Sequence, residues 1–169
     1  MSSKPSLILL AALAALVPAA AHASAAPRCT TGQLSVTPGA AQGAAGSIGQ
    51  NVRLLNVSNR TCTLEGYPGL QMLNASGHAL ATHVHRGASV TVKARPVHLV
   101  TLAPGQKASF DIGYSDATGF SNERCPTSAR VEVTPPNDFK AVTVRWRLQP
   151  YGGSIPHLKC GLISVSPVY

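Results

Sequence analysis

Apolar and polar residues alternate strictly along several stretches of this chain, which is the pattern of a β-strand that buries one face. The clearest stretches are residues 108–114 and residues 142–148, in which every second side chain is apolar. Shorter segments of the same kind occur at residues 34–36, 52–57, 70–73, 90–92, 131–133 and 163–165. Roughly eight to ten strands at this spacing predict an all-β fold, a sandwich of two antiparallel sheets.

Glycine and proline mark the expected turns. The 15 glycines and 13 prolines are spread along the chain, which favours many turns and argues against long helices. Pro104 and Gly105 predict a type II turn, because proline presets φ at the second position and glycine accepts a positive φ at the third. Pro38 and Gly39 are expected to end the first strand, and Trp146 is expected to be an ordinary core residue.

Residues 1–23 have the layout of a cleaved secretory signal. Lys4 precedes an apolar core at residues 7–17, and small residues precede the expected cut after Ala23. This core is too short to span a bilayer, which needs about 20 residues. We therefore expect a secreted or extracytoplasmic protein, in the periplasm or cell wall, with no transmembrane segment in the mature chain. The expected divisions of the chain are a signal peptide at 1–23, a flexible leader at 24–28 and a single domain at 29–169.

All four cysteines lie in the expected mature chain, at Cys29, Cys62, Cys125 and Cys160. An even number of cysteines in an oxidising compartment indicates disulfides. A structural zinc site is the alternative, but such sites usually take two ligands from one short segment, and successive cysteines here are at least 33 residues apart. Because the start of one antiparallel strand lies beside the end of the next, we predict the pairs Cys29 with Cys62 and Cys125 with Cys160.

The chain is basic, with 14 Lys and Arg residues against 6 Asp and Glu residues and a formal net charge of +8 at pH 7. Polyanions are therefore plausible neighbours. For an exported chain we expect anionic polymers of the envelope rather than nucleic acid. The alternative is that the charge only maintains solubility.

Short motifs along the chain match a known arrangement. Their residues are Cys29, the run Cys62-Thr63-Leu64-Glu65-Gly66-Tyr67-Pro68-Gly69, the turn Leu102-Ala103-Pro104-Gly105, and Cys125. On these residues the chain resembles the secreted domain-of-unknown-function family 4232, over nearly all of the mature chain. The resemblance implies an immunoglobulin-like sandwich in bacterial, mainly actinobacterial, envelopes, with no established activity and no catalytic residues. The expected hairpin at residues 78–98 departs from the family, since it looks longer and richer in histidine and basic residues than in the usual member.

Histidines are the strongest candidates for metal ligands in the sequence. His83 and His85 lie two residues apart on an expected edge strand and therefore project from the same face. His78 and His98 lie in the same region, but no Asp or Glu occurs at residues 66–110 to complete a site. We expect no metal and no cofactor, and a histidine-rich metal carrier is the alternative function.

No catalytic constellation stands out in the sequence. The chain lacks a G-x-S-x-G nucleophile elbow, and no cysteine is left over if both disulfides form. The six acidic residues are scattered and make no local carboxylate pair. We therefore expect no enzymatic activity and no catalytic residues. A secreted hydrolase is the least favoured function, since the members of a triad need not be neighbours in sequence.

Basic residues on one expected strand face are candidates for binding. Arg145 and Arg147 project from the same face, and Arg130 is expected beside them on a neighbouring strand. Guanidinium groups bind phosphate or carboxylate in a bidentate way. The alternative is that these arginines form a charged face towards solvent, which prevents the edge of the sheet from pairing with another chain. The candidate binding residues are thus Arg145, Arg147, His83 and His85.

Taken together, the sequence predicts an exported, disulfide-stabilised, non-catalytic binding or structural module of the bacterial cell envelope. Its partner is expected to be an envelope component, either an anionic polymer or another protein. The sequence does not identify that partner.

Overall fold

The computed structural model describes residues 25–44, 46–115, 125–146, 158 and 160–169. The expected signal peptide and the candidate Arg147 lie outside these residues. In the described ranges, no helix has the length and apolar character that crossing a membrane requires.

Ten strands and one short 3-10 helix, η1 (Thr31–Gln33), make up the described elements. The strands are β1 (Leu34–Ala44), β2 (Ser47–Asn56), β3 (Cys62–Leu64), β4 (Gly69–Leu73), β5 (His83–Arg86), β6 (Val100–Leu102), β7 (Lys107–Ser115), β8 (Arg130–Thr134), β9 (Val142–Val144) and β10 (Leu162–Val165). The predicted all-β fold and the predicted number of strands are both confirmed.

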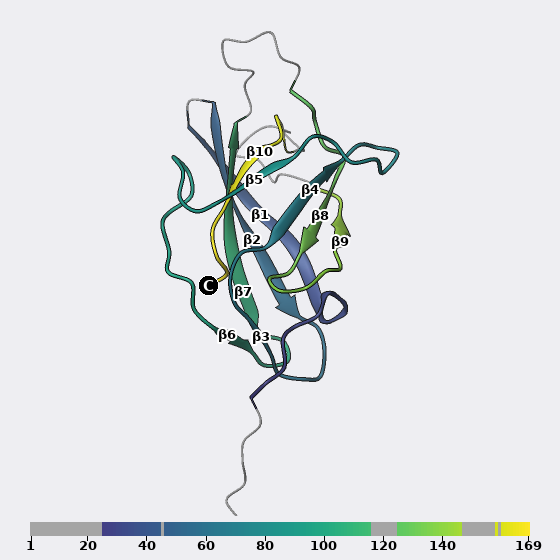
Figure 1. Cartoon of the computed structure of the whole chain (residues 1–169), viewed down its shortest axis with the longest axis vertical. Helices are drawn as coiled ribbons and strands as arrows, with labels where there is room; N and C mark the ends of the chain where they lie inside the picture. The colour runs from purple at the N-terminus through teal and green to yellow at the C-terminus, as the bar shows by residue number, and fades with distance from the viewer. Residues whose placement is uncertain (1–24, 45, 116–124, 147–157, 159) are drawn as a thin grey trace, which may run out of the picture.

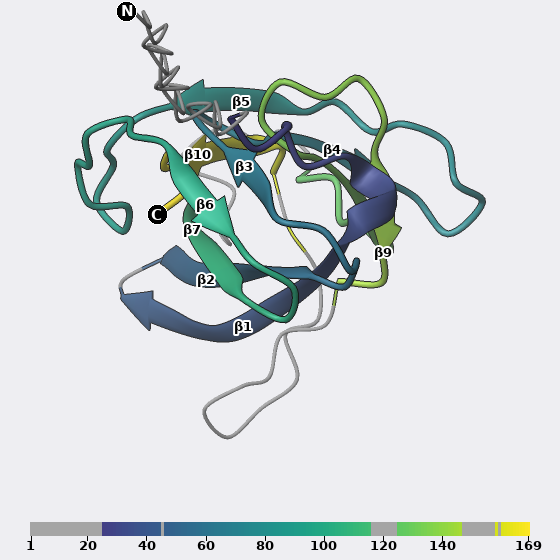
Figure 2. The same cartoon turned by 90° about the horizontal axis from the view of Figure 1, so that it is seen from below.

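The strands form sheets around a common core (Figures 1 and 2). The largest sheet has five strands in the order β1-β2-β7-β10-β5, and a second has three in the order β4-β8-β9. β3 and β6 form a two-stranded sheet, near the lower end of the molecule in Figure 1. The pairs between described strands are antiparallel except β5 with β10, which is parallel. The predicted sandwich-like arrangement is therefore confirmed.

The core takes side chains from both the five-stranded and the three-stranded sheet. On β7, every second side chain over residues 108–114 is buried, as the alternation predicts. The valines of β8 are buried in the same way. Trp146 is buried as expected, and its indole Nε1 donates a hydrogen bond to Oε1 of the buried Gln50 at 2.9 Å. The core therefore contains a buried hydrogen bond between Trp146 and Gln50, which the prediction of an ordinary core residue does not include.

The chain departs from the predicted strands in three places, and the first is at Pro38 and Gly39. These residues do not end the first strand, because β1 continues through them with an irregular register between Pro38 and Ala41. β1 is an edge strand, where the missing N–H of proline need not interrupt a ladder.

The second departure concerns Val90 and Val92, which were expected to lie on a strand. They belong instead to residues 87–99, here called the crossing segment, which runs over the outer face of β2 and β7 in the five-stranded sheet. Within it, Ser89 N donates to the carbonyl oxygen of Val92 at 2.9 Å, and Val92 itself is buried. A local turn that buries one valine therefore accounts for the short alternation.

The third departure is the expected hairpin at residues 78–98. Instead of pairing with a sequence neighbour, β5 pairs in parallel with β10, from His83 opposite Leu162 to Arg86 opposite Val165. A parallel partner so far away along the chain leaves no local signal in the sequence.

Both predicted disulfides are confirmed. Cys29 is bonded to Cys62 and Cys125 to Cys160, and the described residues contain no free cysteine. The local contact at the first bond is nevertheless a parallel bridge between Arg28 and Thr63, with Cys29 N donating to Thr63 O at 2.8 Å. The pairing is thus correct, although the strand geometry behind it is not the antiparallel one expected.

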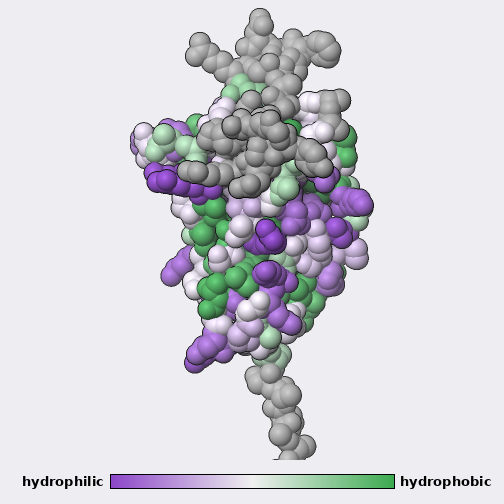
Figure 3. Space-filling model, turned by 180° about the vertical axis from the view of Figure 1, so that it is seen from behind, coloured by the Kyte–Doolittle hydropathy of each residue, from purple (hydrophilic) through white to green (hydrophobic). Residues whose placement is uncertain are grey.

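The surface mixes polar and apolar side chains. On the face seen in Figure 3, over the part that the described residues form, hydrophobic side chains lie among hydrophilic ones. The large apolar side chains exposed on the described surface are Val57, Val90, Val97, Leu99, Phe139 and Leu162. Three of them, Val90, Val97 and Leu99, belong to the crossing segment, and the other three come from separate segments. Scattered apolar residues of this kind are normal on a protein surface and do not by themselves mark a binding site.

Candidate binding groove

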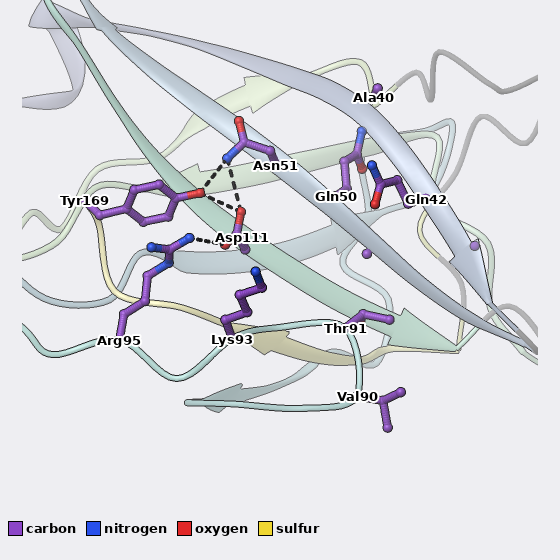
Figure 4. A pocket seen from close by; sticks show the side chains of 12 residues that line it. Ala40, Gln42, Gln50, Asn51, Val90, Thr91, Lys93, Arg95, Asp111 and Tyr169 are labelled. Atoms are coloured by element: carbon purple, nitrogen blue, oxygen red, sulfur yellow. Dashed lines mark hydrogen bonds and ion pairs between the residues drawn. The ribbon is translucent and has the colours of Figure 1, made fainter.

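A polar cluster is centred on the carboxylate of Asp111, on the outer face of β7 (Figure 4). The Tyr169 hydroxyl donates a hydrogen bond to Oδ1 at 2.8 Å, and Nδ2 of Asn51 donates to the same oxygen at 3.1 Å. Nη2 of Arg95 lies 3.3 Å from Oδ2 and forms an ion pair with it. Nδ2 of Asn51 also donates to the Tyr169 hydroxyl, at 3.0 Å. The carboxylate is thus held by side chains from three separate parts of the chain.

The strand register and the backbone beyond β10 place these groups. Asn51 of β2 lies opposite Asp111 of β7 in an antiparallel pair, so both side chains project from the same face. Tyr169 is held by backbone bonds with Ser109, one in each direction, at 2.9 and 2.8 Å. Arg95 comes from the crossing segment, and its Cζ lies 3.6 Å from the centroid of the Tyr169 ring, a cation–π contact.

The electrostatics of the cluster keep the Tyr169 phenol protonated. Burial and the hydrogen bond to Asp111 raise the pKa of Tyr169 above the ordinary tyrosine value, so the phenol remains a donor at neutral pH. Arg95 neutralises the charge of Asp111 across the short ion pair. Nε of Arg95 is buried and has no hydrogen-bond partner among the described residues. The cluster is therefore an ordered scaffold rather than a free acid and base.

This cluster forms one end of a groove between the β1–β2 hairpin and the crossing segment. The groove has a volume of about 650 Å³. Its lining residues are Ala40, Gln42, Gly43, Gly49, Gln50, Asn51, Val90, Thr91, Lys93, Arg95, Asp111 and Tyr169. Figure 4 shows the Lys93 side chain extending into the groove towards the Asp111 cluster. Polar and apolar groups thus contribute in similar measure to this surface, whereas most small-molecule pockets are largely apolar.

Two glycines allow the crossing segment to approach the sheet. Gly49 and Gly113 lie opposite each other on β2 and β7. A Cβ atom added to Gly49 would lie 3.0 Å from Cβ of Thr91, and one added to Gly113 would lie 2.9 Å from both Oγ of Ser89 and Cγ2 of Val92. Only glycine at these positions leaves room for the segment that forms one wall of the groove.

Comparison with known proteins gives the family. The family described as domain of unknown function (DUF4232) matches residues 29–169. The chain belongs to this family. No curated protein and no solved structure matches it. The match supports the resemblance seen in the motif residues and adds no activity to it.

His83, His85 and Arg145, the candidate binding residues that the structure describes, do not line the groove. His83 and His85 are exposed on β5, the edge strand of the five-stranded sheet. Arg145 is exposed just beyond β9, while its proposed neighbour Arg147 is outside the described residues. Across the described ranges, no group of three or more His, Cys, Asp or Glu side chains could hold a metal ion.

The residues of the groove are not predicted by the sequence patterns. Asp111 lies in the alternating stretch at residues 108–114 and is not among the predicted binding residues, and neither are Asn51, Lys93, Arg95 and Tyr169. Asn51 and Tyr169 are separated by 118 positions in sequence, so no local motif connects them. The one usable signal is the pair Lys93 and Arg95, which lies in a stretch without acidic residues, at 66–110. Such a pair of cations is weak evidence for a binding site.

Proposed function

We propose that this protein is an exported, non-catalytic binding module of the bacterial cell envelope, and that it holds its ligand in the groove. The observation that carries the proposal is the preassembled Asp111 cluster at one end of an open groove. Side chains already held in one arrangement lose little conformational freedom on binding, so such a surface suits recognition.

The same geometry supports a non-catalytic role. A general base needs a carboxylate or imidazole that has an acceptor atom free to take up a proton and a pKa near the working pH. Among the described residues that line the groove, Asp111 is the single carboxylate, and it is already bonded to Arg95, Tyr169 and Asn51. The part of the lining that the structure describes contains no histidine and no cysteine.

Export and envelope location rest on the sequence pattern of residues 1–23 and on the two disulfides, which persist in oxidising compartments. The metal-carrier alternative has no specific observation in its favour, because the exposed pair His83 and His85 has no third ligand in the described chain.

A pulldown from envelope extract tests the proposal. The wild-type mature protein should retain an envelope component, and the double variant Gln42→Ala, Lys93→Ala should lose most of it, because both side chains line the groove. Lys107→Ala is the matched control, since it removes the same charge from the exposed start of β7, outside the groove lining.

Arg145→Ala tests the cationic surface expected from the sequence in the same assay. Retention that is unchanged by the groove variant but lost in Arg145→Ala would place the ligand at that surface and overturn the groove. Retention of no envelope component by the wild type would overturn the binding role itself.

A further inference from the structure

The charge of the groove is unbalanced by one cation. Arg95 and Asp111 form the one ion pair found between described residues, so their charges cancel. Lys93 also lines the groove, is exposed, and has no carboxylate within ion-pair distance in the described chain. An unpaired ammonium beside a neutral cluster favours a ligand that brings one anionic group to this position.

The remaining polar groups suit hydroxyls. Gln42 is exposed on the hairpin wall, and its side-chain amide makes no hydrogen bond with any described residue. Asn51 uses its Nδ2 within the cluster, whereas its Oδ1 accepts no bond from the described chain. A side-chain amide offers both a donor and an acceptor, as does a hydroxyl group, so the two pair readily.

An acidic peptide fits this surface less well than a sugar. Extended peptides usually bind by adding a strand to an open sheet edge, with pockets for alternate side chains. The floor of this groove is the face of β2 and β7, whose backbone groups are paired within the sheet. Apolar peptide side chains would also leave the amides of Gln42 and Asn51 without partners, which costs free energy.

We infer that the groove binds an acidic glycan, a polyhydroxylated chain whose carboxylate, sulfate or phosphate group pairs with Lys93 while its hydroxyls pair with Gln42 and Asn51. This inference rests on the proposed function and adds the chemical class of the ligand. The volume of about 650 Å³ lies within the usual range for binding sites, so a short segment of such a chain can be held.

Titration with defined oligomers tests the inference. The probes are oligogalacturonate, a neutral galacto-oligosaccharide of the same length, and oligoglutamate, with isothermal calorimetry at low and at physiological salt. Oligogalacturonate should bind and should weaken as salt rises. Lys93→Ala should weaken it about tenfold, the usual effect of losing one charge-assisted hydrogen bond, and Gln42→Ala about threefold to tenfold. Lys107→Ala should bind within about twofold of the wild type, as expected for an exposed charge outside the site.

A second set of probes distinguishes sulfated from phosphorylated ligands. These probes are sulfated and phosphorylated oligosaccharides of matched charge. Tighter binding of either supports an acidic glycan and identifies its anionic group.

Several outcomes would overturn the inference. Oligoglutamate binding as tightly as oligogalacturonate would show a site for charge alone. Equal affinity for the neutral oligosaccharide, with no effect of Lys93→Ala, would show that the anionic group is not recognised. A groove-dependent envelope pulldown without binding of any glycan would remove the acidic glycan and leave the proposed binding module intact. Glycan binding that no groove variant changes would overturn both.

Discussion

At the scale of single residues, buried polar side chains fix how the loops join the sheets. Asn56 at the end of β2 is fully buried. Its Nδ2 donates to the carbonyl oxygens of Arg60 at 2.8 Å and Leu102 at 3.0 Å, and its Oδ1 accepts from N and Oγ of Ser58. Asn56 also begins an Asn-Val-Ser triplet, but a buried amide with both donors in use is not accessible to a glycosylating enzyme.

Replacing Asn56 should therefore be costly. In Asn56→Ala the carbonyl oxygen of Leu102 loses its side-chain donor inside the fold, and we expect a loss of about 2–3 kcal/mol in the free energy of unfolding. Urea denaturation measures it. Asn59→Ala is the control, since Asn59 is exposed and its loss should cost less than about 0.5 kcal/mol. Equal midpoints for the two variants would contradict this account.

Asp138 holds the turn between β8 and β9 against the N-terminal segment. Its Oδ2 accepts bonds from N and Oγ1 of Thr31, both at 2.7 Å, and its Oδ1 accepts from the backbone N–H groups of Phe139 and Lys140. The Thr31 hydroxyl and then the Thr31 N–H lower the pKa of Asp138 from 3.8 to about 2.

A lowered carboxyl pKa predicts acid sensitivity. The stabilisation is fully present above about pH 4 and is lost as the pH falls towards 2, because the folded state must then take up a proton against these bonds. Asp138→Asn should be less stable than the wild type at pH 6, and the two urea midpoints should converge towards pH 2. Glu132→Gln, which removes a carboxylate without a hydrogen bond in the described chain, should not show this convergence. A constant gap for Asp138→Asn would refute the assignment.

At the scale of elements, the crossing segment and the outer face of β7 define the groove. The segment lies on two glycines, and the hydroxyl of Thr91 donates to the carbonyl oxygen of Ile48 at 3.2 Å. The groove wall therefore depends on close packing of backbone and short side chains rather than on a β-ladder.

Gly113→Ala should disrupt that packing. The added methyl group meets Thr91, Ser89 and the buried Val92, so we expect a loss of about 1–3 kcal/mol and faster amide exchange in the crossing segment. Hydrogen exchange followed by mass spectrometry measures this. Gly32→Ala is the control, because a Cβ at Gly32 meets nothing within 4 Å. Unchanged exchange in the crossing segment would show that it does not need the glycine.

At the scale of the whole molecule, two covalent bonds tie distant parts of the sandwich together. Cys29–Cys62 spans 33 positions and joins the segment before η1 to β3. Cys125–Cys160 spans 35 positions and joins the segment before β8 to the one before β10. By the chain-entropy estimate, each bond lowers the free energy of the folded state relative to the unfolded state by about 3.8 kcal/mol.

Removing either disulfide should consequently cost a large part of the stability. The double variant Cys29→Ala, Cys62→Ala should lose about 3–4 kcal/mol, and reduction of the wild type should lower its denaturation midpoint further, because both bonds are then lost. Guanidinium denaturation with and without reductant measures both effects. Identical midpoints under the two conditions would mean that the bonds contribute little.

Local pattern explains which features were predictable. The alternation at residues 108–114 determines the buried face of β7, because side chains on a strand alternate regardless of its partner. Gly105 adopts a positive φ of 77°, as expected after Pro104. By contrast, the alternation at residues 90–92 was too short to separate a strand from a turn, and the parallel pairing of β5 left no trace in its own residues.

The sequence by itself therefore determined the all-β class, the approximate number of strands and the family. It also supported the correct cysteine pairs, because these depend on period-two alternation, turn residues and spacing along the chain. The tertiary structure alone decided the strand order and the groove. Asn51, Arg95, Asp111 and Tyr169 meet only because β2, the crossing segment, β7 and the last residues of the sequence are brought to one face. Contacts across such separations depend on which strands pair, and local side-chain patterns do not encode that choice.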